Sequence, residues 1–329
     1  MIFFLIPLVL AVSAPVYPEV PDIVVTSLAD SGPGSLRQAI ADAPANGTIR
    51  FAVDGDIGLT SGELLIDKPL RVLGRQRRVA VRGNPNDFNL RVFHIIAGPV
   101  KISDLTIQGG NKFLLGGDDS GGGIYNAADL TLDRVTIRDN KANFGGGIYN
   151  GSGATLTIIN STISGNTAID PGICDGGYGA GIWNNGGTVT LTSSTITDNE
   201  AECLGGGVFQ TSGAVTFNNT IVAKQSFSSD CRQGFVNSVG GAGQFISLGF
   251  NLDSDNTCGL DQPSDLPGVN PRLGPLQDNG GWTDTHLPMA GSPVIDAGDV
   301  STAPGRDQRG VRRPQGPAAD IGSVEVEVP

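Results

Sequence analysis

The chain has 329 residues, enough for one large domain or two ordinary ones, and its 49 glycines exceed what a globular core usually tolerates. A solenoid can use so much glycine, because every coil needs tight corners and glycine adopts left-handed backbone at little cost. The net charge of −12 favours solubility and argues against nucleic acid as a partner, since nucleic-acid-binding surfaces are basic.

The N-terminus predicts export. Residues 1–14 form an apolar run that ends in small residues, as a signal peptidase site does, and the run is short for a membrane span. We therefore expect a secreted or cell-surface protein with no membrane-spanning segment after signal removal. Residues 15–60 are interpreted as a linker and an N-terminal cap. In this cap Leu36, Ala39 and Ile40 share one face of a short helix, which would cover the first coil.

Residues 61–260 contain two phrases that recur together. Gly-Gly-Gly-Ile-Tyr-Asn begins at Gly121 and returns in variant form at Gly145, Gly179 and Gly205, in steps of 24, 34 and 26 residues. A strand-like phrase follows each copy. Self-similarity at a period of about 20 to 50 residues is typical of a solenoid. Three short strands per coil, stacked in register, predict an all-β fold, a single-stranded right-handed parallel β-helix.

Polar residues mark the corners of the predicted coils. Asp133-Arg134 interrupts the alternation of inward and outward residues, so we expect a corner there. Asparagines recur at two fixed positions of the repeat, and an asparagine side chain tolerates left-handed backbone and can bond to the next coil. Two asparagine ladders are therefore expected at corners: Asn126, Asn150 and Asn184 in one, and Asn140, Asn166 and Asn199 in the other.

The four cysteines include no Cys-x-x-Cys pair, which argues against a zinc site. Cys174 and Cys203 occupy similar loop positions on successive repeats, and Cys231 and Cys258 bracket the next segment. We predict disulfides 174–203 and 231–258, which an exported protein could form. Residues 261–329 are rich in proline and glycine, and we interpret them as a closing segment that packs along or over the last coils.

Several of these phrases together resemble the right-handed parallel β-helix proteins of bacterial surfaces, particularly those with a choice-of-anchor Q C-terminal domain and polymorphic-outer-membrane-protein-like repeats. The likeness covers about residues 24 to 325. It rests on Ser31-Gly-Pro-Gly-Ser-Leu-Arg-Gln-Ala-Ile40, the glycine repeats, Gly291-Ser-Pro-Val-Ile-Asp-Ala-Gly298, Asp307-Gln-Arg-Gly310 and Asp320-Ile-Gly322. The resemblance implies export and a pectin-lyase-like fold. The family has no agreed activity, so no catalytic residue is carried over.

One aromatic residue per coil occupies the same position beside an inward aliphatic residue. Tyr125, Tyr149, Trp183 and Phe209 should therefore point outward and stack at the coil spacing of about 4.8 Å. Flat aromatic faces suit sugar rings, so this column is our candidate glycan-binding site. The alternative is that the stack stabilises successive coils or lies under a loop.

Acidic loops precede the glycine phrase. Asp118, Asp119 and Asp175 could converge and hold Ca²⁺, the one cofactor we consider, although isolated solvated acids explain them more simply. A lyase acting on an acidic glycan would also need a base, and by coil position Arg134 and Arg138 are the nearest candidates. His94 and His286 are interpreted as structural.

Two other surface features leave alternatives open. Residues 68–91 are locally basic, which suits either a polyanion such as a uronate polysaccharide or a solvated face. Two outward threonine columns suit either ice binding or an ordinary exposed strand: Thr131, Thr157, Thr190 and Thr216 in one, and Thr136, Thr162, Thr195 and Thr220 in the other.

The preferred hypothesis is an exported, non-catalytic surface or matrix protein, monomeric, that binds a polysaccharide or cell-surface ligand. The alternatives are a polysaccharide lyase or hydrolase, and a structural module that self-associates through an uncapped terminal coil.

Overall fold

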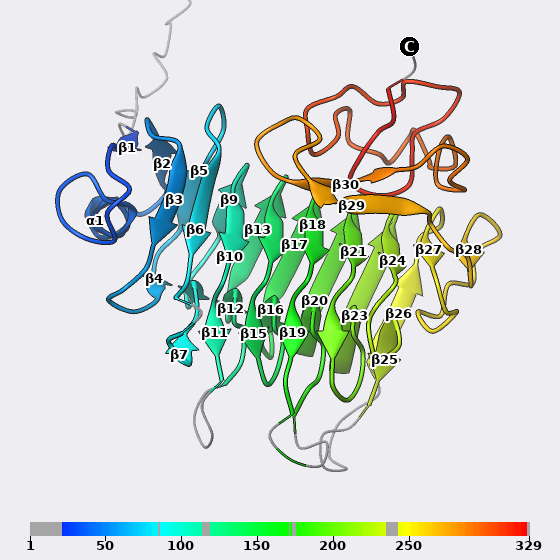
Figure 1. The fold of residues 1–329 in the computed structure, drawn as a ribbon, viewed down its shortest axis with the longest axis horizontal. Helices are drawn as coiled ribbons and strands as arrows, with labels where there is room; N and C mark the ends of the chain where they lie inside the picture. The colour runs from blue at the N-terminus through cyan, green and yellow to red at the C-terminus, as the bar shows by residue number, and fades with distance from the viewer. Residues whose placement is uncertain are drawn as a thin grey trace, which may run out of the picture.

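The computed structural model describes residues 22–84, 86–113, 119–170, 172, 176–234 and 243–327. It confirms an all-β parallel β-helix, in which coils stack along the long axis of the molecule (Figure 1). The proposed signal peptide lies outside the described residues. Among those residues, no helix is both long and apolar enough to cross a membrane.

The first sheet has two rows of parallel strands that meet at a corner. One row contains β4 (Leu64–Ile66), β8 (Phe93–Ile95), β12 (Ile124–Asn126), β16 (Ile148–Asn150) and β25 (Cys231–Gln233). The other contains β1 (Ile23–Val25), β2 (Gly47–Phe51), β5 (Leu70–Leu73), β9 (Val100–Ser103), β13 (Asp129–Asp133), β17 (Thr155–Ile159) and β26 (Gln244–Ser247). The long strands β20 (Ile182–Thr192) and β23 (Val208–Asn218) run through both rows.

The second sheet follows the next corner of each coil. Its strands are β3 (Gly55–Gly58), β6 (Val79–Arg82), β10 (Thr106–Gln108), β14 (Thr136–Arg138), β18 (Thr162–Ser164), β21 (Thr195–Thr197), β24 (Ile221–Ala223), β27 (Leu252–Asp253) and β28 (Leu266–Pro267). The third sheet has β7 (Asn89–Leu90), β11 (Asn111–Lys112), β15 (Lys141–Ala142), β19 (Thr167–Ala168) and β22 (Glu200–Ala201). A regular coil therefore has four short strand segments instead of the predicted three.

The predicted corner after Asp133 is confirmed. Arg134 has a φ of 57°, and Asp104, Asn160, Ser193 and Asn219 at the same corner of other coils have φ between 46° and 56°. Short polar residues tolerate this left-handed backbone better than β-branched residues do, which explains the polar character of the position.

Both predicted asparagine ladders are also present. The Nδ2 group of Asn126 donates to Oδ1 of Asn150, and Asn150 donates in turn to Asn184, at 2.8 and 2.9 Å. Asn140, Asn166 and Asn199 repeat the pattern, with Gln225 as the last member. Because these amides are buried, their mutual hydrogen bonds satisfy groups that would otherwise destabilise the core.

Both ends of the hydrophobic core are covered by the chain itself. Helix α1 (Leu36–Asp42) buries Leu36, Ala39 and Ile40 against the first coil, as predicted. At the other end Cys258 and Leu260 join the core. The uncapped terminal coil that would favour self-association is therefore not found in the described part of the chain. The solenoid also begins earlier than residue 61, because β1, β2 and β3 already belong to its sheets.

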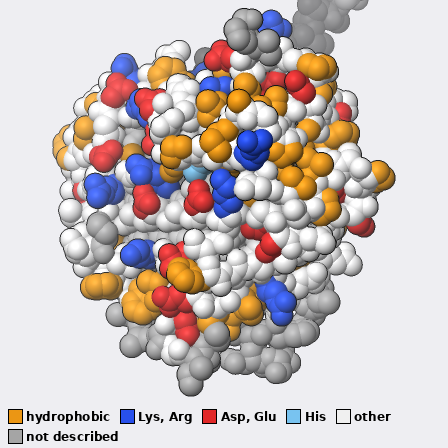
Figure 2. Space-filling model, turned by 45° about the vertical axis from the view of Figure 1, so that its right-hand side comes forward, with side chains coloured by type: hydrophobic (Ala, Val, Ile, Leu, Met, Phe, Trp, Pro, Cys, Tyr) orange, Lys and Arg blue, Asp and Glu red, His pale blue; other side chains and the backbone are white. Residues whose placement is uncertain are grey.

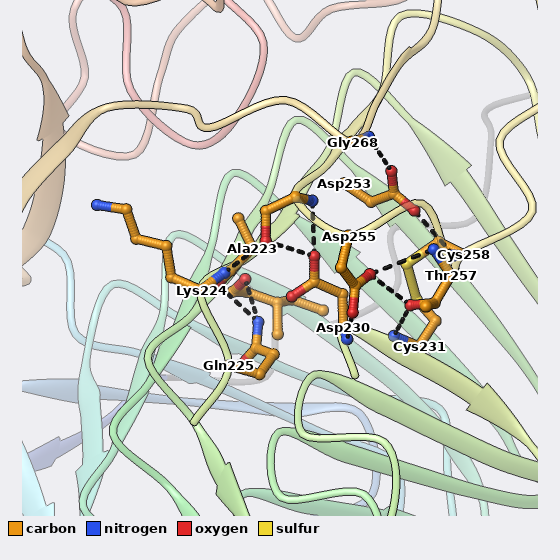
Figure 3. Close-up of a disulfide and its surroundings, with 12 residues drawn as sticks. Ala223, Lys224, Gln225, Asp230, Cys231, Asp253, Asp255, Thr257, Cys258 and Gly268 are labelled. Atoms are coloured by element: carbon orange, nitrogen blue, oxygen red, sulfur yellow. Dashed lines mark hydrogen bonds between the residues drawn. A yellow bond between two sulfur atoms is a disulfide. The ribbon is translucent and has the colours of Figure 1, made fainter. Parts of the chain in front are cut away.

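The disulfide between Cys231 and Cys258 is confirmed, with a Cα–Cα distance of 4.8 Å. It joins β25 to the loop that covers the last coil, beside the carboxylates of Asp230 and Asp255 (Figure 3). Cys203 is also disulfide-bonded. Its predicted partner, Cys174, lies outside the described residues, so that pairing stays a prediction.

The C-terminal segment covers the outer face of the second sheet and not only its last coils. It contains the hairpin of β29 (Leu273–Gln277) and β30 (Thr285–Pro288), followed by loops that lie over the coils (Figure 1). Three of the predicted outward threonines, Thr136, Thr162 and Thr195, are 0 to 2% exposed because this segment covers them. Their hydroxyls bond to the segment, for example to Gln308 and Ser323, which removes this column as an ice-binding face.

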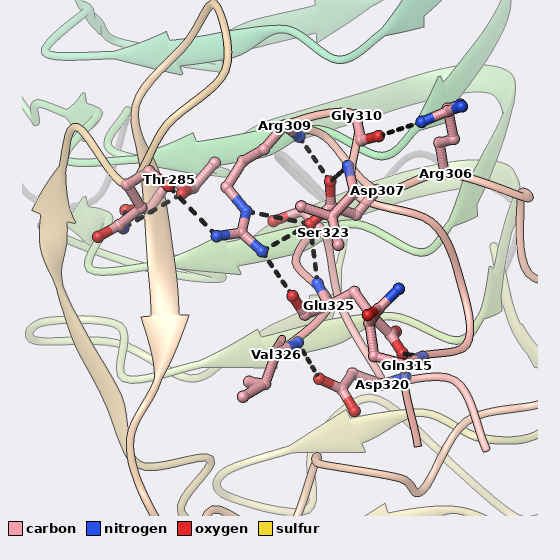
Figure 4. A network of polar contacts seen from close by, with 12 residues as sticks. Thr285, Arg306, Asp307, Arg309, Gly310, Gln315, Asp320, Ser323, Glu325 and Val326 are labelled. Carbon is pink, nitrogen blue, oxygen red and sulfur yellow. Dashed lines mark hydrogen bonds and ion pairs between the residues drawn. The ribbon is translucent and has the colours of Figure 1, made fainter. Parts of the chain in front are cut away.

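Buried charges hold the C-terminal loops together. The guanidinium group of Arg313 donates to the Glu325 carboxylate at 3.1 Å, and both side chains are almost completely buried. Arg309 bonds to Asp307 and to the carbonyl oxygens of Asn279 and Glu325 (Figure 4). Breaking such a network would leave a charge buried without its partner, so these contacts stabilise the folded arrangement of the loops.

Candidate anionic-ligand groove

The predicted aromatic column exists but is largely buried. Tyr125, Tyr149, Trp183 and Phe209 pair in register on successive coils. However, Tyr149 is only 8% exposed, Trp183 is 7% exposed, and Phe209 is not exposed. The expectation of an open sugar-binding face is therefore wrong for these three rings.

A second column, of two aromatic residues and a leucine, covers the first. Phe144, Tyr178 and Leu204 follow one another on successive coils and pack against the first column. The ring centroids of Phe144 and Trp183 are 4.5 Å apart, and those of Tyr178 and Phe209 are 4.9 Å apart. The aromatic residues thus stabilise the stacking of coils under a loop, which was the alternative interpretation.

The calcium site stays a prediction. Asp118 and Asp175 lie outside the described residues, and Asp119 accepts a hydrogen bond from Asn143. Within the described ranges, no group of three or more histidine, cysteine or acidic side chains could hold a metal ion.

A concave surface lies where the solenoid corner meets the C-terminal segment. Three adjoining depressions of about 160, 240 and 530 Å³ form a groove there. Trp282 lines the first two, whereas Arg134 and Arg306 line both the second and the third. The described lining residues include seven arginines and four aspartates: Arg75, Arg78, Arg134, Arg138, Arg306, Arg309, Arg312, Asp56, Asp104, Asp133 and Asp284.

The positive charge of the groove is local. The whole chain has 33 acidic and 21 basic residues. On the face shown in Figure 2, acidic and basic side chains are intermixed, and hydrophobic side chains gather toward the upper right. An excess of arginine in one groove of an acidic protein favours binding of an anionic ligand.

Four of the arginines already have carboxylate partners. Arg78 pairs with Asp278 and Asp284, Arg138 with Asp139, and Arg309 with Asp307. Arg134 makes two hydrogen bonds with Asp104, at 2.6 and 2.9 Å. These pairs shape the walls of the groove.

The other three arginines, Arg75, Arg306 and Arg312, are exposed and form no ion pair with any described residue. Arg306 donates to the carbonyl oxygen of Gly310 at 2.7 Å, which orients its side chain and leaves other N–H groups available. Arg306 and Arg312 face each other across an antiparallel bridge. Unpaired guanidinium groups of this kind are suited to carboxylate ligands.

The loop that presents Arg306 and Arg312 is held in place. The backbone carbonyl oxygen of Arg306 accepts a hydrogen bond from Asn160 Nδ2 at 2.9 Å. The Gln308 side chain forms hydrogen bonds with threonines of two coils. Asp307 accepts from the backbone N–H groups of Arg309 and Val311, both at 2.8 Å, which fixes the turn. A ligand would therefore meet a preorganised surface.

The two candidate bases do not have the properties of bases. Burial alone would lower the pKa of Arg134, but the hydrogen bonds and charge of Asp104 outweigh it and raise that pKa above its usual value. Arg134 therefore stays protonated and acts as a cation. Arg138 lines the smallest depression and is bound to Asp139 at 2.8 Å.

Sequence reasoning missed Trp282, Arg306 and Arg312 as site residues. A usable signal was present, because the stretch from Arg306 to Arg313 contains four arginines in an acidic chain. The basic region 68–91 contributes Arg75 and Arg78 to the groove, and its interpretation as a polyanion surface stays a prediction.

His94 forms a partly exposed pair with Glu63 that could take part in acid–base chemistry. Its Nδ1 lies 2.7 Å from Oε1 of Glu63, and the two side chains are 23 and 31% exposed. Burial would raise the pKa of Glu63, but the hydrogen bond from His94 and the charge of Arg91 lower it below its usual value. An ionised Glu63 orients the ring by accepting the Nδ1 proton, and a neutral tautomer held in this way would carry its lone pair at Nε2.

No protein-family model matches the chain, and no curated protein matches it in sequence. Among solved structures, the chain is similar to the crystal structure of the pectate lyase Pel9A. The TM-score is 0.48, with 13% identity over 93% of this chain and 97% of that one. The function of this chain therefore has to be inferred from its own residues.

Proposed function

We propose that the protein is an exported, non-catalytic β-helix protein of a cell surface or matrix that binds an acidic glycan along the groove. The observation that carries this proposal is a set of three arginines that form no ion pair within the described residues: Arg75 and Arg306 line one depression with Trp282, and Arg312 lines the adjoining one. An extended polymer with one negative charge per unit could contact several of them in turn. Disulfide bonding supports export, because cytosolic proteins rarely keep such bonds.

The sequence resemblance to choice-of-anchor Q proteins belongs to this proposal as well. It would make the C-terminal segment a module of surface proteins. In this chain that segment forms one wall of the groove, which gives the module a ligand-binding role.

Chromatography on immobilised polygalacturonate tests the proposal. The purified protein should be retained at low salt and released as salt rises, because exposed charges are screened within about 10 Å at 0.1 M. The variant Arg306→Gln/Arg312→Gln should elute earlier than Arg71→Gln/Arg232→Gln, which loses equal charge outside the groove. Elution of wild type in the void volume of this and other acidic glycan columns would refute the proposal.

A second candidate function is catalysis on the same class of glycan, and the Glu63–His94 pair favours it. A histidine oriented by a carboxylate is a common general base, and the Arg91 guanidinium lies 4.7 Å from the ring centroid of Tyr125 nearby. Absorbance near 235 nm would detect unsaturated uronates. Turnover that is lost in His94→Ala but kept in Arg306→Gln/Arg312→Gln would establish an enzyme in place of a binding protein.

A further inference from the structure

The middle depression of the groove has room for one small chemical group but not for a drug-sized ligand. Its volume of about 240 Å³ is below the range of roughly 300 to 1,000 Å³ that encloses a drug-sized ligand. Trp282, Arg75 and Arg306 line it, and the Trp282 side chain is 36% exposed. It therefore combines an accessible flat apolar surface with two guanidinium groups that pair with no carboxylate among the residues that the structure describes.

The chemistry of these side chains defines what could occupy the depression. A guanidinium fork matches a planar carboxylate through two parallel hydrogen bonds, which a compact ammonium group could not provide. The indole ring offers a flat face to the apolar side of a sugar ring. The Gln308 amide is not available to a ligand, because it is already hydrogen-bonded to Thr136, Thr162 and Thr283.

We infer that this depression is a subsite for one hexuronate unit, with the sugar ring against Trp282 and the carboxylate between Arg75 and Arg306. The inference rests on the proposed function and specifies its ligand. The neighbouring depression of about 530 Å³ shares Arg306 and adds Arg312, so it receives the next acidic unit of the chain. The groove is thus specific for a carboxylated sugar and does not bind every polyanion equally well.

Titration calorimetry with three probes tests this assignment. The probes are galacturonic acid trisaccharide, neutral galactose trisaccharide, and a short polyglutamate that has carboxylates but no sugar ring. The variants are Trp282→Ala and Arg75→Gln, with Phe227→Ala as control because Phe227 is an exposed aromatic residue outside the groove lining.

We expect wild type to bind the galacturonate trisaccharide at least tenfold more tightly than the neutral one. Trp282→Ala should weaken that binding about tenfold and leave polyglutamate binding unchanged, whereas Arg75→Gln should weaken both. Phe227→Ala should bind as wild type does. Far-ultraviolet circular dichroism would confirm that each variant is folded.

Two results would overturn the inference, and they differ in what they leave standing. Equal binding of galacturonate and polyglutamate, with Trp282→Ala unchanged for both, would remove the sugar subsite and leave a general polyanion groove. No binding of any acidic probe by wild type would remove the proposed function together with the subsite.

Discussion

The pH dependence of stability at Asp230 tests the structure, because this carboxyl group is buried where its charged form is unfavourable. It is 2% exposed beside the Cys231–Cys258 disulfide, and Asp255 lies next to it (Figure 3). Burial raises the pKa of Asp230, and hydrogen bonds from Ser254 oppose this while the charge of Asp255 adds to it. The resulting pKa is about 7, against 3.8 for the free group.

The sign of the pH effect follows from this difference. Between pH 4 and 7 the folded protein holds a proton on Asp230 that the unfolded chain has released, so this group's contribution to stability falls as pH rises. The contribution is complete below pH 3.8 and is lost as pH passes through 7. At 1.36 kcal/mol per pH unit, the full effect is at most about 4 kcal/mol.

The substitution Asp230→Asn removes the titration. Asparagine keeps an oxygen that can accept from the backbone N–H and hydroxyl of Ser254, which lie 2.6 and 2.7 Å from Oδ2 of Asp230. Urea denaturation of both proteins at pH 4, 6 and 8 would give the difference in unfolding free energy. Titrating groups that do not interact with Asp230 contribute equally to both proteins and cancel in this difference, whereas the change in Asp255, whose charge acts on Asp230, belongs to the measured effect.

We expect the variant to gain stability relative to wild type by as much as about 4 kcal/mol between pH 4 and pH 8. Asp261→Asn, an exposed control, should show no such gain. A difference between Asp230→Asn and wild type that stays constant from pH 4 to pH 8 would refute the assigned environment of Asp230.

Three further predictions concern the elements that build the groove and close the solenoid. Replacing Cys231 and Cys258 by alanine should lower the free energy of unfolding by about 3.5 kcal/mol, from the loop of 27 residues that the bond closes; an unchanged urea midpoint would contradict this. Gln308→Ala should lower the free energy of unfolding by about 3 kcal/mol, because it leaves buried threonine hydroxyls unpaired. It should also speed proteolysis of the C-terminal segment. Equal cleavage rates in variant and wild type would show that Gln308 does not hold this segment in place. Arg134→Met should cost about 3 kcal/mol by stranding the buried carboxylate of Asp104, and adding Asp104→Asn should recover part of it in a double-mutant cycle; additive losses would argue against the pair.

The coil architecture could be predicted because the same alternation of inward and outward residues recurs in each repeat. Leu130 and Leu132 alternate with polar residues as a strand requires, and each copy of the repeat confirms the pattern. The asparagine ladders followed from the same logic, since a polar residue at one corner position recurs on every coil. The end cap α1 was predictable because an open first coil requires a cover.

The exposure of the aromatic and threonine columns could not be predicted in this way. Strand alternation shows that Trp183 and Thr162 point away from the core, but not what lies over them. Trp183 is covered by Phe144 of a neighbouring coil, and Thr162 by Gln308, which is 146 residues away in sequence. Such long-range covering has no periodic signature, so outward-pointing residues were mistaken for solvent-exposed ones.

The groove was missed for a related reason. Its walls come from the β5–β6 turn, the solenoid corner and the loop around Arg306, and only the fold brings these segments together. The C-terminal segment has no repeat, so its arginines could not be assigned to a face by pattern.

The most direct test of the proposed function is the dissociation constant of an acidic glycan for wild type and for Arg306→Gln/Arg312→Gln. With oligogalacturonate at low salt, loss of these two cations should weaken binding at least about tenfold. The equal-charge control Arg71→Gln/Arg232→Gln should change it less than about twofold, because exposed charges outside the groove are screened. Equal weakening in both variants would contradict the groove and leave only a general charge effect.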